Sequence, residues 1–285
     1  MRLSQEELAS GQLLPETLEL AANLVRVNGF VTFEEIIPRA VIDKLYDAYI
    51  DILEPYLAEH HEEVYNPKNG FNDGTNHIRL YLPFEKPFVD EQILAHPFVL
   101  SVVDQVLGDD CAIRYFATNT SLPGGRNAQP VHSDMHSMFG LRYGANLPIS
   151  NLIVNVPLVD TTENNGPMEY WPGGTHLQPD YMYDRKSFPK AKLAEHMTVL
   201  KATMPAGSIM IRDDRMWHRG TPNKSDKPRP NIAVIYSAPT TNPSKGTIPI
   251  PQETFDGLSP RLQKLLRFEK IGHPALKPTH YEVKP

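Results

Sequence analysis

Amphipathic segments occupy the first third of the chain. In residues 15–29, 38–61 and 96–110, apolar side chains recur at helical spacing, which predicts three helices that each bury one face. A glycine closes the first and third segments, and Gly29 stands where a helix cap belongs. Because proline disrupts helix interiors, we expect an interruption of the second helix near Pro55.

After residue 110 the pattern changes to short segments rich in β-branched and aromatic residues, bounded by clusters of Gly, Pro and Asn. These segments are residues 111–122, 150–160, 168–173, 197–214 and 230–239. Several short strands with turn signals predict a sandwich or jelly roll, and residues 259–272 predict a closing helix before the tail. We therefore expect one domain over residues 1–285: helices to about residue 110, a β core over about 111–240, and a helix with a tail over 241–285.

Composition narrows the possible partners. Hydrophobic residues make up 40% of the 285 residues, the net charge is −6, and no run of Lys or Arg suggests nucleic acid or an anionic membrane. The first residues have no apolar signal core, and no apolar run approaches the roughly 20 residues of a membrane span. Cys111 is the only cysteine, which excludes intrachain disulfides and cysteine-based metal clusters. A cytoplasmic protein is the expectation.

The stretch QPVHSDMH, residues 129–136, is the first candidate for chemistry. Pro130 and the absence of a glutamate after His132 argue against a helical zinc motif. On an extended segment, His132 and Asp134 share a face and can bind one cation, and His136 shares that face if the strand continues. The alternative is a solvated loop.

A second polar feature strengthens the metal interpretation. Residues 208–236 predict strand, turn and strand, and an antiparallel hairpin would bring His218 close to Arg229. With His218 as third ligand, two imidazoles and one carboxylate form the facial triad of non-haem Fe(II) oxygenases. A guanidinium at the start of an apolar strand fits a carboxylate such as the far end of 2-oxoglutarate, although a surface ion pair with a nearby aspartate is the alternative.

These residues resemble a known family. His132-x-Asp134, then His218, then Arg229 follow the ligand and co-substrate pattern of the phytanoyl-CoA dioxygenase family of Fe(II)/2-oxoglutarate oxygenases. Residues 29–45 and 165–176 also resemble family segments, so the likeness runs from about residue 25 to 240. The sequence around Trp171 and Trp217 is similar to antibiotic-tailoring members.

The resemblance implies a double-stranded β-helix that uses Fe(II), 2-oxoglutarate and O₂ to oxidise a C–H bond of a small molecule. It implies that Gln129 and Asn119 help to hold 2-oxoglutarate. Some members place a serine against the far carboxylate where this chain has Gly220, and Thr221 is expected to replace it. Asp134 indicates a non-halogenating oxygenase, since halogenating members have a small residue there.

The expected substrate wall is residues 76–84 together with 135–148. Arg79, His136 and Arg142 are the candidate substrate contacts, with His77 beside them, and they suit a polar or anionic small molecule. Two other functions stay open: a cupin-like metal enzyme that does not use 2-oxoglutarate, and a non-catalytic binding protein of the same fold.

Overall fold

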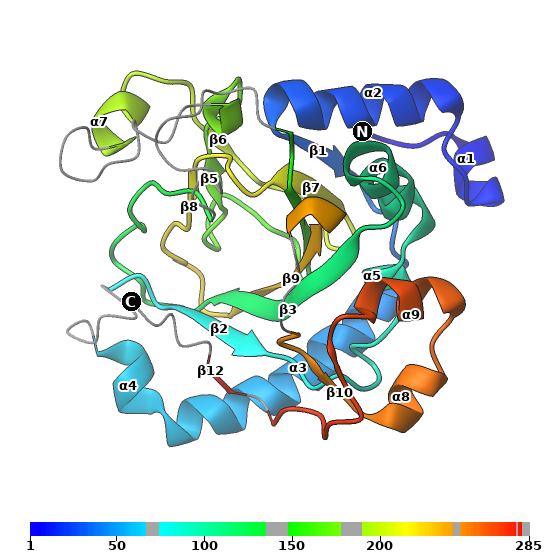
Figure 1. The fold of residues 1–285 in the computed structure, drawn as a ribbon. Helices are drawn as coiled ribbons and strands as arrows, with labels where there is room; N and C mark the ends of the chain where they lie inside the picture. The colour runs from blue at the N-terminus through cyan, green and yellow to red at the C-terminus, as the bar shows by residue number, and fades with distance from the viewer. Residues whose placement is uncertain (67–73, 135–147, 178–189, 242–245, 278, 281–285) are drawn as a thin grey trace.

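The structure of the protein is a computed structural model, which describes residues 1–66, 74–134, 148–177, 190–241, 246–277, 279 and 280 (Figure 1). Its helices are α1 (Gln5–Ser10), α2 (Pro15–Asn28), α3 (Arg39–Glu59), α4 (His61–Tyr65), α5 (Glu91–Leu94), α6 (Pro97–Leu107), α7 (Lys190–Ala194), α8 (Gln252–Asp256) and α9 (Pro260–Leu266), with 3₁₀ turns η1 (Thr175–Leu177) and η3 (Pro239–Thr241). Its strands are β1 (Phe30–Phe33), β2 (His77–Tyr81), β3 (Ala112–Ser121), β4 (Asn151–Pro157), β5 (Glu169–Tyr170), β6 (Leu200–Lys201), β7 (Ile209–Asp213), β8 (His218–Arg219), β9 (Arg229–Ser237), β10 (Pro249–Ile250), β11 (Lys270–Ile271) and β12 (Thr279–His280).

The three helices predicted from periodicity are confirmed as α2, α3 and α6. Helix α2 ends at Gly29, whose φ of 88° is the left-handed conformation that glycine adopts without strain. The interruption expected at Pro55 is wrong, because α3 continues through it to Glu59. The buried stripe of Leu45, Tyr49 and Leu53 anchors the turns before the proline, so packing outweighs one lost backbone hydrogen bond.

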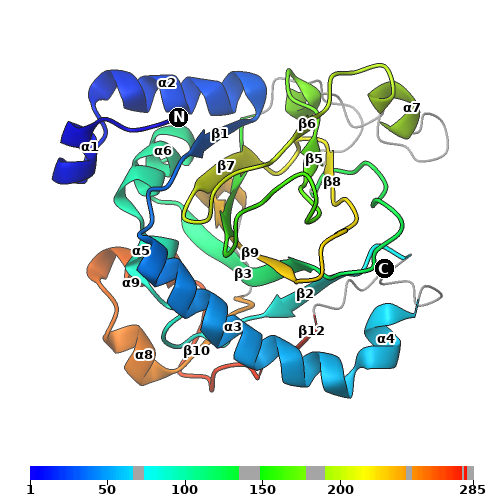
Figure 2. The same cartoon turned by 180° about the vertical axis from the view of Figure 1, so that it is seen from behind.

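A long antiparallel sheet forms the centre of the fold. Its strand order is β1-β7-β4-β9-β3-β2-β12, and a smaller sheet has the order β6-β5-β8. Figures 1 and 2 show β5, β6 and β8 at the end of the molecule away from α8 and α9. An isolated bridge between His132 and His218 extends the smaller sheet. Both sheets are antiparallel, and most neighbouring strands are not consecutive in sequence, which confirms the predicted jelly roll.

The outer face of the long sheet is apolar and is covered by helices. Alternate residues of β3 and β9, such as Phe116, Ile232 and Val234, are at most 1% exposed and join one large core with α2, α3 and α6. Where polar atoms reach this face they are paired: the Tyr49 hydroxyl on α3 contacts Thr120 Oγ1 at 2.6 Å, and Thr118 Oγ1 donates to it at 3.0 Å. This face therefore serves stability.

The inner face of the same strands is polar. The register pairs His77 of β2 with Ser121 of β3, and Ser121 with Arg229 of β9. Two residues along each strand, the next row comprises Arg79, Asn119 and Asn231. Because side chains in one row share a face, charged and amide groups gather inside the jelly roll.

The remaining segments differ from the sequence predictions in detail. The closing helix predicted over 259–272 ends at Leu266 as α9, and the following residues form β11. Residues 197–214 contain two strands, because a proline-glycine turn separates β6 from β7. The helical first third also contributes β1 and β2, and the tail contributes β12, which pairs with β2. Across the described ranges, no helix is long and apolar enough to cross a membrane.

Candidate metal centre

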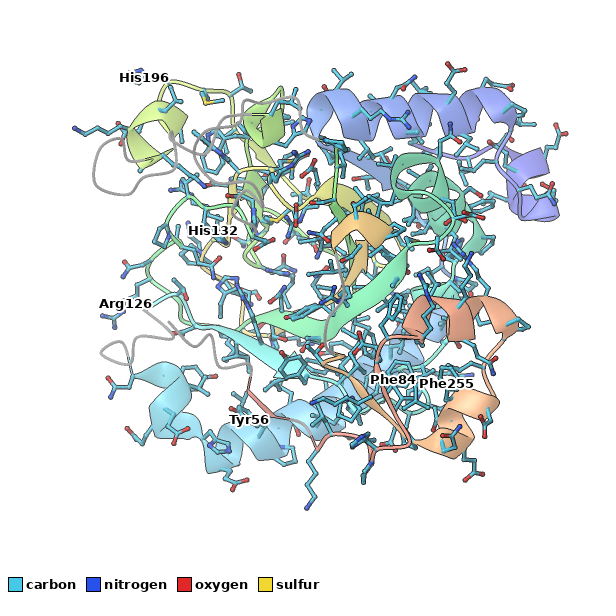
Figure 3. All side chains as sticks on the ribbon, viewed as in Figure 1. Tyr56, Phe84, Arg126, His132, His196 and Phe255 are labelled. Carbon is cyan, nitrogen blue, oxygen red and sulfur yellow. The ribbon has the colours of Figure 1, made fainter. Side chains whose placement is uncertain are left out.

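Two histidines from separate parts of the chain meet at the smaller sheet. His132 and His218 exchange backbone hydrogen bonds at 3.0 and 2.9 Å, and their ring centroids lie 4.4 Å apart. His132 is seen beside β8 in Figure 3. The bridge fixes the spacing of two side chains that are far apart in sequence.

Backbone carbonyls orient both imidazole rings. His132 Nδ1 lies 2.7 Å from the carbonyl of Pro130, and His218 Nδ1 lies 3.0 Å from that of Met216. A carbonyl only accepts, so each Nδ1 carries a proton, and in the neutral ring this leaves the lone pair on Nε2. This is the tautomer in which histidine binds a metal through Nε2.

Asp134 lies opposite the two Nε2 atoms. Its Oδ1 is 3.9 Å from His132 Nε2, and its Oδ2 is 3.4 Å from His218 Nε2. The three residues present one ligand atom each within 4.8 Å of one another. Two imidazoles and one carboxylate on one side of a point are a donor set that fits Fe(II) and leaves further coordination positions open.

Electrostatics keep His132 and Asp134 in the protonation states that metal binding needs. Burial, and then the positive charge that His218 would carry, lower the pKa of His132 to about 4, so its ring is neutral at neutral pH. Burial alone would raise the pKa of Asp134, but the positive charge that His218 would carry, and then the charge on Arg212, hold that pKa well below its usual range. Asp134 is therefore ionised.

Arg212 is a residue of this site that the sequence analysis missed. It lies on β7, its side chain is 4% exposed, and its Nη2 donates to Asp134 Oδ2 at 2.7 Å. Its Nε donates to Asn155 Oδ1 at 3.1 Å. The sequence did contain a signal for Arg212, because an arginine inside the apolar run of β7 is either exposed at the surface or buried beside an anion.

Arg229 lies on the inner face as expected, and it is 8% exposed. Its Nη2 donates to the carbonyl of Gly166 at 2.7 Å, and its buried Nε has no hydrogen-bond partner among the described residues. Burial lowers the pKa of Arg229 to about 10, and the group is still a cation at neutral pH. The alternative of an ion pair with a nearby aspartate is wrong for the described part of the chain, where Asp213 pairs with Arg215 instead.

The hairpin predicted between His218 and Arg229 is also wrong. His218 lies on β8 and pairs with Tyr170 in the smaller sheet, whereas Arg229 lies on β9 and opposes Ser121 in the long sheet. The turn between them crosses from one sheet to the other. The triad and Arg229 consequently come from the two sheets of the jelly roll.

Gln129, Gly220 and His77 form a close group near Arg229. Gln129 Oε1 accepts from the Gly220 amide at 2.9 Å. A Cβ on Gly220 would lie 2.7 Å from His77 Nε2 and 2.8 Å from Gln129 Oε1, so only glycine fits without displacing one of them. Burial, and then the charge of Arg229, lower the pKa of His77 to about 3, which keeps it neutral.

The other predicted site residues have these positions. Asn119 and Arg79 are opposite each other on the inner face, both half-buried. The Thr221 hydroxyl donates to the carbonyl of Pro167 at 2.6 Å, so its proton is already engaged. His136 and Arg142 lie outside the described residues.

Fold and site together define a class: a jelly roll with a His/Asp/His facial set inside it and a buried arginine on the facing sheet. The sequence matches the family described as phytanoyl-CoA dioxygenase (PhyH) over residues 25–231, and the chain belongs to this family. The matched range contains His132, Asp134, His218 and Arg229.

Curated relatives are fungal proteins named as dioxygenases. The chain is 27% identical to dioxygenase af480 of Aspergillus fumigatus, over 68% of this chain and 59% of the relative, and 24% identical to dioxygenase andF of Emericella variicolor, over 64% and 61%. It is 23% identical to dioxygenase olcK of Penicillium canescens, over 93% of this chain and 85% of the relative. The chain thus spans about six tenths of the length of the first two.

Solved structures agree on the fold. The epimerase SnoN from nogalamycin biosynthesis, described as non-haem and α-ketoglutarate dependent, superposes with a TM-score of 0.54 at 20% identity over 79% of this chain and 82% of SnoN. The carbocyclase SnoK from the same biosynthesis gives 0.56 at 19% identity, over 79% of this chain and 84% of SnoK. At these identities the likeness concerns the fold.

Proposed function

We propose that this protein is a non-haem Fe(II)- and 2-oxoglutarate-dependent oxygenase that oxidises a C–H bond of a small molecule, in natural-product metabolism. The observation that carries the proposal is the His132, Asp134 and His218 set, with both Nε2 atoms turned to one carboxylate. Membership of the phytanoyl-CoA dioxygenase family supports the same chemistry. The relatives named as dioxygenases agree with it.

In this proposal His132 Nε2, Asp134 and His218 Nε2 hold the iron, and Arg229 holds the far carboxylate of 2-oxoglutarate. The buried Nε of Arg229 is a donor that a carboxylate can accept, and the fork of the guanidinium suits a bidentate contact. A buried cation with no carboxylate among its described neighbours favours an anionic ligand. A cupin-like enzyme without 2-oxoglutarate would not need this group.

The chain's own residues orient the co-substrate and substrate, while bound iron, 2-oxoglutarate and O₂ supply the oxidising chemistry. Gln129 and Asn119 line the same interior and can donate amide protons to 2-oxoglutarate. Thr221 is proposed to replace the family's serine, and its hydroxyl would have to turn from the carbonyl of Pro167 to donate to the far carboxylate. Asp134 occupies the ligand position, which supports oxygenation rather than halogenation.

The substrate is proposed to be a polar or anionic small molecule that contacts Arg79, His136 and Arg142. Arg79 lies near His132, since its charge helps to lower the pKa of that ligand. We further propose a cytoplasmic location without nucleic-acid or membrane partners. The net charge of −6 and one buried cysteine, whose pKa burial raises to about 11, are compatible with it.

The proposed function is tested by measuring 2-oxoglutarate turnover by the purified protein. Purified protein with Fe(II), ascorbate and 2-oxoglutarate should form succinate slowly alone and faster when a substrate is found among small polar metabolites. Omission of Fe(II) or 2-oxoglutarate should stop it. Metal-dependent oxidation of a substrate without 2-oxoglutarate consumption would instead favour the cupin-like enzyme, and ligand binding without any turnover would favour a binding protein.

A further inference from the structure

Arg212 is a buried cation with few partners. Its guanidinium donates to Asp134 Oδ2 at 2.7 Å and to Asn155 Oδ1 at 3.1 Å. Its Nη1 is buried and has no hydrogen-bond partner in the described part of the chain. A charge in such a place is expensive, so its contact with Asp134 has to offset a large desolvation cost.

That contact selects one of two equivalent carboxylate oxygens. Asp134 Oδ1 lies 3.9 Å from His132 Nε2 and Oδ2 lies 3.4 Å from His218 Nε2, so both oxygens face the position between the imidazoles. A carboxylate can bind a cation through one oxygen or through two. Binding through two would occupy a position that a facial triad leaves for other ligands.

We propose that Arg212 is a positioning residue that engages Asp134 Oδ2, so that Asp134 offers only Oδ1 to the metal. This inference rests on the proposed function. Its consequence is that the positions beyond the triad remain available to 2-oxoglutarate and O₂. Asn155 contributes by fixing the orientation of the Arg212 guanidinium through Nε.

A different result is expected if the ion pair between Arg212 and Asp134 only stabilises the fold. If Arg212 only held Asp134 in place, its loss would weaken metal binding, and 2-oxoglutarate binding would fall as a consequence and in step with it. If Arg212 blocks the second oxygen, its loss frees that oxygen for the metal. Metal affinity is then retained, and 2-oxoglutarate, which competes with the second oxygen, binds more weakly.

The experiment measures both affinities on the full chain without oxygen. Co(II), whose visible spectrum reports coordination, serves as the metal probe, and 2-oxoglutarate is titrated into the metal-loaded protein. Arg212→Met should keep Co(II) affinity within about tenfold of the wild type, while 2-oxoglutarate affinity falls by about tenfold or more, because 2-oxoglutarate must then displace the second Asp134 oxygen from the metal. The Co(II) spectrum before 2-oxoglutarate is added should also differ from that of the wild type.

Arg212→Lys is the matched control, since an ammonium can still donate to Oδ2, and it should recover most of the 2-oxoglutarate affinity. Asn155→Ala should shift 2-oxoglutarate affinity in the same direction as Arg212→Met but by less. If Arg212→Met does not fold, these two variants decide. Parallel loss of both affinities, or wild-type binding in all variants, would overturn the inference. A wild-type protein that binds Co(II) but no 2-oxoglutarate would instead contradict the proposed function.

Discussion

The two faces of the long sheet are built from alternate residues of the same strands, and they differ in almost every physical respect. On β3, Thr118 and Thr120 point outward to Tyr49 of α3, and Asn119 between them points inward. Outward groups are buried and paired with each other. Inward groups include a cation, Arg229, whose buried Nε has no partner among the described residues. Polar groups that satisfy one another stabilise the fold, whereas polar groups left unsatisfied indicate a ligand.

Removal of a metal ligand from the inner face should have the largest effect on activity. His132→Ala should abolish iron-dependent 2-oxoglutarate turnover, because one of three ligand atoms is lost. Its thermal unfolding should stay near that of the metal-free wild type, since the side chain is 28% exposed. Succinate formation and the unfolding midpoint are the two measurements. Full turnover in this variant would remove His132 from the ligand set.

Arg229→Leu should have the next largest effect. Loss of a charge-assisted contact of about 1.5–3 kcal/mol raises the 2-oxoglutarate concentration required by roughly 10- to 150-fold. Arg229→Lys should also be impaired, because an ammonium does not reproduce the planar fork. The measurement is the dependence of succinate formation on 2-oxoglutarate concentration. An unchanged dependence in the Leu variant would favour an enzyme that does not use this co-substrate.

Gly220→Ala tests the close packing beside Arg229. The added methyl group would lie 2.7 Å from His77 Nε2 and 2.8 Å from Gln129 Oε1, so one of them must move. We expect weaker 2-oxoglutarate binding by about tenfold, as displacement of a positioned group can cost up to about 10²-fold. Removing the clash in Gly220→Ala/His77→Ala should recover part of the loss. If Gly220→Ala binds as tightly as wild type, this group is not part of the pocket.

Tyr49→Phe is the matching change on the outer face. It removes the hydroxyl that contacts Thr118 and Thr120, and a buried hydrogen bond contributes about 1 kcal/mol. The unfolding midpoint should fall by about 2–4 °C, and 2-oxoglutarate binding should not change. A change in 2-oxoglutarate affinity without loss of stability would mean that the two faces are not separate in function.

The last prediction is a pH dependence of metal-free stability that comes from His77. The folded pKa of His77 is lowered to about 3 from an ordinary value of about 6.5, so the unfolded chain binds more protons between these values. Stability from this residue is present above about pH 6.5 and is lost as pH falls towards about 3. His77→Gln should therefore lose less stability than wild type between pH 7 and 4, measured by denaturant unfolding. Identical pH profiles would show that His77 is not held neutral by the fold.

Local pattern predicted much of this fold but not how the sheets assemble. Helix α2 and its cap at Gly29 follow from spacing and glycine alone, because both are local effects. The continuation of α3 through Pro55 depends on tertiary packing of its buried stripe, which periodicity does not report. The strand segments could be predicted, but the crossing of the chain from one sheet to the other between His218 and Arg229 could not. A turn-rich sequence is the same whether it joins two strands of a hairpin or two different sheets.

The same distinction applies to the site. The His132, Asp134 and His218 set could be predicted from residue types and order, and the structure brings these residues together. Arg212 was not found from the sequence, and His77 was expected only beside the substrate contacts, because the neighbours of both residues lie far along the chain. Arg212 contacts Asp134, and His77 lies against Gly220. Contacts of this kind depend on the register of the long sheet.

The most direct test of the account is anaerobic addition of Fe(II) and then 2-oxoglutarate to the full chain, followed by its visible spectrum. We predict a weak charge-transfer band that requires both additions, saturates with 2-oxoglutarate, disappears in His132→Ala and needs far more 2-oxoglutarate in Arg229→Leu. Tyr49→Phe should give the wild-type titration. If no band forms in wild-type protein that binds Fe(II), the inner face does not hold 2-oxoglutarate on the metal, and the account is contradicted.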